Sequence, residues 1–175
     1  GLGDVPNQYH PTRLESLTFD NDEIINVSLG PGITIIHTNK GKVYGFGKSV
    51  YGIIGTQTEK DIFYPTAMSF FDLNEAHWIT EISFGYSHAT FKTSKDVFFN
   101  LGYNNLSQLG FGPAMITDPI NMSQLPVFKN AVLSHVSNGG YFQVVIVDNQ
   151  LKVTGYSENG ALGTPIQRNT WNTIH

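Results

Sequence analysis

The sequence predicts an all-β fold, most of it built from three tandem copies of one short unit. Glycines recur at a constant spacing, and the segments between them are apolar, partly β-branched runs that are typical of strands. No long stretch has the apolar period of a helix. The composition suits a folded domain, since 40% of the 175 residues are hydrophobic and only 14% are charged.

The period of the repeat follows from its glycines. Equivalent glycines are separated by 55 residues and then by 53 or 54 residues in three independent registers. These registers are Gly30, Gly85 and Gly139; Gly47, Gly102 and Gly155; and Gly55, Gly110 and Gly163. Because three registers agree, the spacing indicates a tandem repeat rather than a chance pattern in a glycine-rich chain.

Each copy is expected to contain four strands, and the first copy illustrates their order. Its expected parts are an apolar pair (Ile24 and Val27), Ser-x-Gly (28–30), a partly β-branched run (33–36), a tight turn (39–41), a returning strand (43–44) and, after a glycine loop, a proline-containing stretch that leads to a short strand. The Gly, Asn and Asp residues of the turns tolerate the left-handed φ that hairpins need.

The loop that closes each copy has the spacing Gly-x4-Gly-x2-Gly. It consists of Gly47, Gly52 and Gly55 in the first copy, Gly102, Ser107 and Gly110 in the second, and Gly155, Gly160 and Gly163 in the third. Glycines at fixed spacing predict demanding backbone angles and close packing. A phosphate-binding role is disfavoured, because no Gly-Lys-Ser/Thr sequence and no following helix accompany these glycines.

Four strands per copy is the content of one propeller blade, so the expected fold is a β-propeller of four-stranded antiparallel blades. We expect residues 1–175 to form one partial propeller of about three blades plus part of another. The expected boundaries are the tail of a preceding repeat (1–20), repeat one (24–72), repeat two (78–125), repeat three (132–166) and an irregular tail (167–175).

Several short motifs resemble the regulator of chromosome condensation repeat. The best matches are Val27-Ser28-Leu29-Gly30, Gly41 to Gly47, Gly85-Tyr86-Ser87-His88, Ser107-Gln108-Leu109-Gly110 and Gly160-Ala161-Leu162-Gly163. The resemblance covers nearly the whole chain and implies a closed propeller of seven blades. The chain departs from the family pattern at Ile33 and Phe142, which stand where His88 lies in the second copy.

A partial propeller would expose the apolar flanks of its terminal blades and their unpaired strand edges. Either the chain is a fragment of a longer polypeptide, or another protein covers the open sides. The first interpretation is favoured, because repeat arrays need closure or caps and neither end resembles a cap.

Recognisable reaction chemistry is absent from the sequence. There is no cysteine, and the ten Lys and Arg residues are scattered in a chain of net charge −4, which disfavours nucleic-acid binding. The six histidines include no helical metal-binding pair, and Asp20, Asp22 and Glu23 lack the other ligands of a calcium loop. His88 is interpreted as structural. We therefore expect no catalytic residue, no metal and no cofactor.

Segments unique to one copy are expected to carry partner contacts, because residues shared by all copies hold the blades together. Two such segments contain the candidate contact residues Phe70, Phe71 and Trp78, and Phe111, Met115 and Ile116. Exposed aromatic and Met side chains there would anchor an interface. The alternative is that they cover the blade edges.

The sequence favours a non-catalytic protein–protein interaction or scaffold module, including a structural subunit of a larger assembly. The expected partner is a protein, either the remaining blades or another subunit. The alternative, which the resemblance implies, is a guanine-nucleotide exchange factor for a small GTPase. The absence of cysteine suits an intracellular compartment, and no apolar run is long enough for a membrane span.

Overall fold

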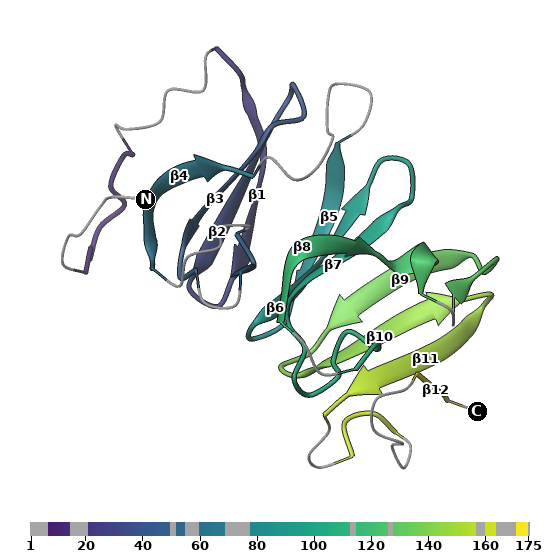
Figure 1. Cartoon of the computed structure of the whole chain (residues 1–175). Coiled ribbons are helices and arrows are strands. Elements are labelled where there is room, and N and C mark those ends of the chain that lie inside the picture. The colour runs from purple at the N-terminus through teal and green to yellow at the C-terminus, as the bar shows by residue number, and fades with distance from the viewer. Residues whose placement is uncertain are drawn as a thin grey trace.

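Three four-stranded antiparallel sheets succeed one another along the chain in the computed structural model (Figure 1). The structure describes residues 7–14, 21–49, 52–54, 60–68, 78–112, 115–125, 128–156, 160–163 and 171–174, apart from the side chains of 115–121 and 123. The predicted all-β fold, with four-stranded antiparallel blades in a partial propeller, is confirmed.

Each sheet is one blade, and its strands pair in chain order. Blade one contains β1 (Ile24–Gly30), β2 (Ile33–Thr38), β3 (Val43–Gly47) and β4 (Ile62–Ala67). Blade two contains β5 (Ile79–Phe84), β6 (His88–Thr93), β7 (Phe98–Tyr103) and β8 (Met115–Asn121), followed by the short 3-10 helix η2 (Met122–Gln124). Blade three contains β9 (Leu133–Asn138), β10 (Phe142–Val147), β11 (Gln150–Gly155) and β12 (Asn172–Thr173).

The fourth strand of blade three comes from the segment expected to be an irregular tail. In β12, Asn172 pairs with Val153 and Thr173 pairs with Lys152 of β11. The prolines lie where strand pairing allows them, because Pro65 and Pro119 are in β4 and β8, the edge strands of their sheets.

A reciprocal pair of backbone and side-chain hydrogen bonds recurs in every blade. In blade three the Val132 amide donates to the Asp148 carboxylate at 2.9 Å, and the Asp148 amide donates to the Val132 carbonyl at 3.0 Å. The equivalent pairs are Glu23 with Asn39 and Trp78 with Ser94, and the partners of each pair are 16 residues apart. These bonds tie the start of the first strand to the turn after the second, which explains the polar residue in each turn.

One glycine register is required by the backbone. Gly47, Gly102 and Gly155 have φ values of 109°, 110° and 105°, which side chains rarely adopt. A Cβ on Gly102 would also lie 2.6 Å from the Ser87 carbonyl oxygen. In the middle register, Ser107 has a φ of 58° where Gly52 and Gly160 have 72° and 71°, so it keeps the left-handed conformation of the glycines that it replaces.

The apolar cores lie between blades. One cluster joins Ile33, Ile35 and Val43 of blade one to blade-two residues that include Phe91 and Leu101. A second cluster joins Phe98, Met122, Leu125 and Phe128 to Val136, Val145 and Val147 of blade three. Because each blade completes the core of its neighbour, the face of a terminal blade that has no neighbour keeps apolar residues at its surface.

Candidate interaction surfaces

Each blade has two faces, which we name by chain order. The leading face points toward the preceding blade and the trailing face toward the following blade. Between blades one and two, the trailing residues Ile33, Ile35 and Val43 are at most 5% exposed, as are the leading residues Ala89 and Phe91. This interface is apolar and shows what a covered blade face looks like.

The interface between blades two and three contains a buried polar network. Gln143 of β10 donates from Nε2 to Thr90 Oγ1 at 2.7 Å and to Asn138 Oδ1 at 2.8 Å. Asn100 donates from Nδ2 to Gln143 Oε1 at 3.2 Å. Asn138 also donates from its backbone amide to Ser83 Oγ at 2.8 Å and from its side chain to the Ser83 carbonyl at 2.7 Å. Thr90, Asn100 and Gln143 are at most 2% exposed, so their polar groups depend on one another.

The trailing face of blade three is open in the described part of the chain. Leu151 is 41% exposed, whereas Val43 and Phe98, which occupy its repeat position in the other blades, are each 4% exposed. Val144 and Ile146 are half-buried. A groove of about 360 Å³ runs along this face, and it is lined by Glu81, Ile82, Ser83, His135, Val136, Ser137, Val144, Ile146 and Leu151. Its floor is largely apolar and its rim carries a carboxylate, an imidazole and two hydroxyls.

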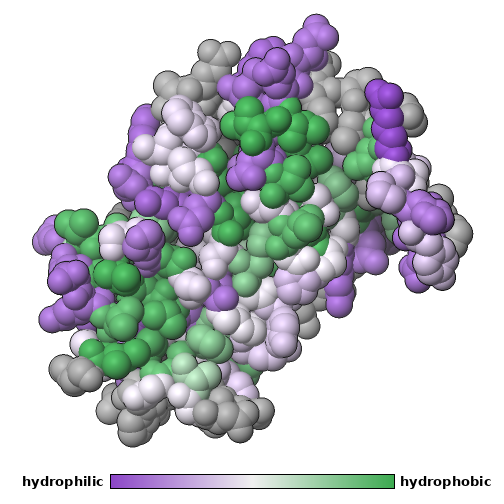
Figure 2. Space-filling model, turned by 180° about the vertical axis from the view of Figure 1, so that it is seen from behind, coloured by the Kyte–Doolittle hydropathy of each residue, from purple (hydrophilic) through white to green (hydrophobic). Residues whose placement is uncertain are grey.

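The leading face of blade one is open as well. Val27 and Leu29 of β1 are 50% and 72% exposed, whereas Val136, which occupies the repeat position of Val27 in blade three, is 7% exposed. At the repeat positions of Leu151 and Val27, the exposed residue is therefore the one that has no neighbouring blade. Figure 2 shows hydrophobic residues gathered in separate groups on one side of the molecule.

Three tyrosines lie near one another on the side of the blades where the glycine loops emerge. Tyr86, Tyr141 and Tyr156 are 64%, 38% and 40% exposed. The rings of Tyr86 and Tyr141 meet edge to face with centroids 5.4 Å apart, and the Tyr156 amide donates to the Tyr141 carbonyl at 2.9 Å. Partly exposed aromatic side chains of this kind can anchor a protein partner.

Two histidines are buried between blades. Burial lowers the pKa of His88 to about 4, although the Phe142 backbone and the Asn138 side chain beside it partly oppose the shift. Burial also lowers the pKa of His37, which lies near the Ile79 backbone. Neither ring makes a well-formed hydrogen bond. Both imidazoles are therefore neutral at pH 7 and act as packing groups.

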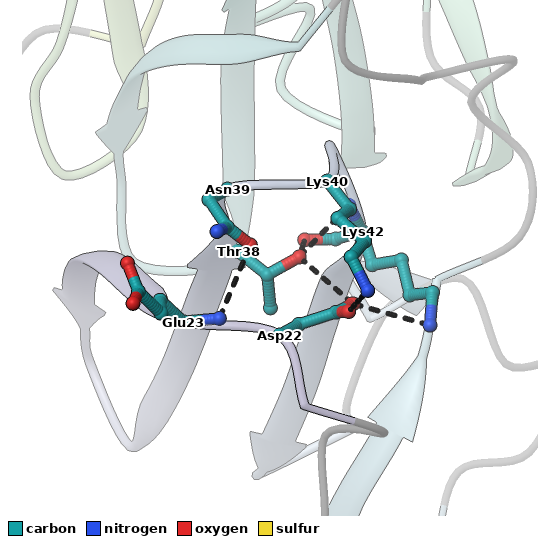
Figure 3. A network of polar contacts seen from close by, with 6 residues as sticks. All are labelled: Asp22, Glu23, Thr38, Asn39, Lys40 and Lys42. Carbon is teal, nitrogen blue, oxygen red and sulfur yellow. Dashed lines mark hydrogen bonds and ion pairs between the residues drawn. The ribbon is translucent and has the colours of Figure 1, made fainter.

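A buried carboxylate pairs with two lysines at the start of blade one (Figure 3). Asp22 lies 2.7 Å from Lys40 Nζ and 3.1 Å from Lys42 Nζ, and its side chain is buried while both lysines remain almost half exposed. The Lys40 ammonium is the main reason that the pKa of Asp22 is lowered. Two ammonium groups at this carboxylate disfavour a cation there. Within the described ranges, no cluster of His, Asp and Glu could hold a metal ion.

The expected contact residues have different surroundings. Phe70 and Phe71 lie outside the described residues, and so do the side chains of Met115 and Ile116 in β8. Trp78 is 38% exposed and belongs to the recurring hydrogen-bond pair with Ser94, while Phe111 packs against the second core cluster.

Exposed apolar flanks of the terminal blades were expected from the sequence, but the residues that form them were not identified, and neither was the polar network. The repeat does carry a signal for the network, because its four polar residues stand at positions that another blade fills with apolar residues or glycine. Thr90 and Asn100 replace Ile35 and Gly45 of blade one. The leading residues Asn138 and Gln143 replace Phe84 and Ala89 of blade two.

Comparison with known proteins agrees with the repeat. The Regulator of chromosome condensation (RCC1) repeat matches residues 40–91, which run from the hairpin turn of blade one into β6 of blade two. Two solved structures share its fold. Human WBSCR16 matches 88% of the chain and 40% of its own length with a TM-score of 0.69 at 22% identity, and Prp20p of Saccharomyces cerevisiae matches 85% of the chain and 34% of its own length with a TM-score of 0.65 at 19% identity. The chain therefore contains a segment that matches the RCC1 repeat, and it shares the β-propeller fold of these solved structures.

The RCC1-type relatives are longer proteins. The chain is 27% identical over 147 residues to the Regulator of chromosome condensation of Homo sapiens and 23% identical over 164 residues to the Ultraviolet-B receptor UVR8 of Arabidopsis thaliana. It is 28% identical over 152 residues to a bifunctional serine/threonine-protein kinase/NEDD4-like E3 ubiquitin-protein ligase of Dictyostelium discoideum. These matches cover 82% to 93% of the chain but only 8% to 36% of the relatives.

Proposed function

We propose that this chain is a non-catalytic interaction module that binds protein through the open faces of its partial propeller. The observation that carries the proposal is the exposure of Leu151, at a repeat position that is buried wherever a neighbouring blade is present. An apolar groove on a blade face is stabilised when another protein removes it from water. The cover is either a further part of the same polypeptide or a separate subunit.

Other features support binding rather than catalysis. The two histidines with lowered pKa are buried between blades, and the buried carboxylate of Asp22 is held by two lysines.

In the described ranges, no helix has the length and apolar character of a membrane span. The absence of cysteine suits an intracellular compartment, and we include that location in the proposal.

The test compares the trailing face in two states. Hydrogen–deuterium exchange of peptides covering residues 142–155 is measured in the recombinant 175-residue chain and in the native polypeptide, whose intact mass is determined in parallel. Slower exchange in the native state is expected, and the mass then shows whether the cover belongs to the same chain. Equal exchange in both states would contradict the proposal.

Guanine-nucleotide exchange on a small GTPase is the second candidate. It is supported by the similarity to the human Regulator of chromosome condensation and by the fold shared with Prp20p, a protein with binding properties toward Gsp1p and histones. Exchange needs a surface that stabilises the nucleotide-free GTPase, and the three exposed tyrosines are the surface that we assign to it. Release of a fluorescent guanine nucleotide from a panel of small GTPases tests this candidate, and it fails if no member responds.

A further inference from the structure

The chemistry of an interface between blades is set by two pairs of repeat positions. The pair on the trailing face is Ile35 and Gly45 in blade one, Thr90 and Asn100 in blade two, and Val144 and Val153 in blade three. The pair on the leading face is Phe84 and Ala89 in blade two, and Asn138 and Gln143 in blade three. All four positions are apolar or glycine in the first interface, and all four are polar in the second.

The first interface shows the apolar combination. Ile35 and Ala89 are both 0% exposed. The Phe84 ring lies so close to Gly30 that a Cβ there would be 2.6 Å from Phe84 Cδ1. Nothing in this slot offers a side-chain hydrogen bond, and the aromatic ring fills the space.

The second interface shows the polar combination. Gln143 needs Thr90 as an acceptor at 2.7 Å, and its carbonyl oxygen accepts from Asn100 at 3.2 Å. An amide buried without such partners loses its hydrogen bonds to water and receives nothing in return. A leading face with Asn and Gln therefore fits a trailing face with Thr and Asn, and not an apolar one.

The open trailing face of blade three is of the apolar kind. Val144 occupies the position of Thr90 and lines the groove together with Ile146 and Leu151. Val153, at the position of Asn100, is 0% exposed and has no side-chain polar group. Ser137 also lines the groove, but serine occupies this position in all three blades (Ser28 and Ser83), so it does not distinguish the two combinations.

We propose that the trailing face of blade three binds a further RCC1-type blade whose leading face is apolar at the positions of Phe84 and Ala89, and that it rejects a blade with amide side chains there. This specifies the partner of the proposed function and rests on it. The geometry of the bound blade follows the first interface, in which Ile35 occupies the place of Val144.

The experiment appends a blade to the full chain. After a flexible linker, one fusion carries a second copy of residues 78–131, and a matched fusion carries the same copy with Phe84→Asn and Ala89→Gln. Because the chain has no cysteine, a Leu151→Cys substitution in the first part gives a single thiol on the trailing face. The rate of thiol labelling reports whether the face is covered, and a Tyr64→Cys variant, at a 58% exposed position of blade one, is the control site.

Labelling of the Leu151→Cys variant is expected to slow at least tenfold in the fusion with the apolar copy and to stay within twofold of the unfused chain in the fusion with the amide copy. Labelling at the control site should not change in either. Equal labelling rates in the two fusions, whether slow or fast, would overturn the proposal.

A second variant guards against an appended amide copy that fails to fold. Val144→Thr supplies the hydroxyl that Thr90 supplies in the second interface, and Thr has nearly the shape of Val. It should slow labelling at least threefold in the fusion with the amide copy and speed it in the fusion with the apolar copy. No change in either fusion would show that polarity does not select the partner. Protection of residues 142–155 in the native polypeptide would still support the proposed function in that case.

Discussion

Lowering the pH from 7 to 5 is expected to destabilise the chain by about 2 kcal/mol through His88 alone. The pKa of His88 is lowered from 6.5 to about 4 by burial between blades two and three. Between these two values the unfolded chain binds a proton that the folded chain does not, so the free energy of unfolding falls as the pH falls. Each pH unit within that window contributes about 1.4 kcal/mol. The contribution of His88 is complete above pH 6.5 and is lost progressively toward pH 4.

Urea unfolding of the 175-residue chain at a series of pH values measures this slope. The matched control is His88→Phe, because Phe142 occupies the same repeat position in blade three. This variant should lose about 2 kcal/mol of the difference between pH 7 and pH 5, and His37, whose pKa is also lowered by burial, accounts for a remaining slope of the same sign. Asp22 cannot supply the slope, since its pKa lies below 3.8 and its stabilising effect is lost only below that pH. An unchanged slope in His88→Phe would refute the reasoning.

The remaining predictions concern single contacts, each measured by urea or thermal unfolding. Gln143→Leu should destabilise the chain by about 2 kcal/mol, because it removes the hydrogen bonds that Gln143 makes with the buried Thr90 and Asn100. The control Gln124→Leu, at an exposed position, should change the stability by less than about 0.5 kcal/mol. Similar losses in both variants would contradict the role of the network. Gly102→Ala should lower the free energy of unfolding by about 3 kcal/mol, because it adds a clash with the Ser87 carbonyl to an unfavourable φ of 110°. Gly112→Ala, at a φ of 88° where the added Cβ would have no atom within 4 Å, should lower it by about 1 kcal/mol. Equal losses in the two variants would show that the close contact is unimportant. Asp148→Ala should cost about 1 kcal/mol through the lost acceptor for the Val132 amide, and a neutral effect would show that the recurring pair does not fasten the blade.

The backbone of the repeat could be predicted from the sequence because its constraints are local. Gly102 is fixed by its own φ and by a carbonyl of the same blade, and Ser107 keeps the conformation of the glycine that it replaces. Such requirements recur in every copy and leave a glycine spacing that is visible without a structure.

Burial could not be predicted in the same way, because it depends on the neighbouring blade. Val27 and Val136 occupy one repeat position, yet they are 50% and 7% exposed. The fourth strand of blade three was missed for a related reason, since β12 contains only two residues and pairs across a long connection. The composition of a segment alone therefore predicts neither the burial of its residues nor a fourth strand as short as β12.

The alternation between apolar and polar interfaces also addresses a hazard of repeat proteins. Blades with the same strand order can pair with the wrong neighbour, which leads to misassembly or domain swapping. If blade three docked on the trailing face of blade one, Asn138 and Gln143 would meet Ile35 and Gly45, and Gln143 would lose the hydrogen bonds that Thr90 and Asn100 supply. If blade two docked on another copy of itself, Ala89 would stand in the place of Gln143, and the Asn100 amide would lose its acceptor on the neighbouring blade. The polar network thus favours blade three as the neighbour of the trailing face of blade two, because Gln143 finds Thr90 and Asn100 together only there.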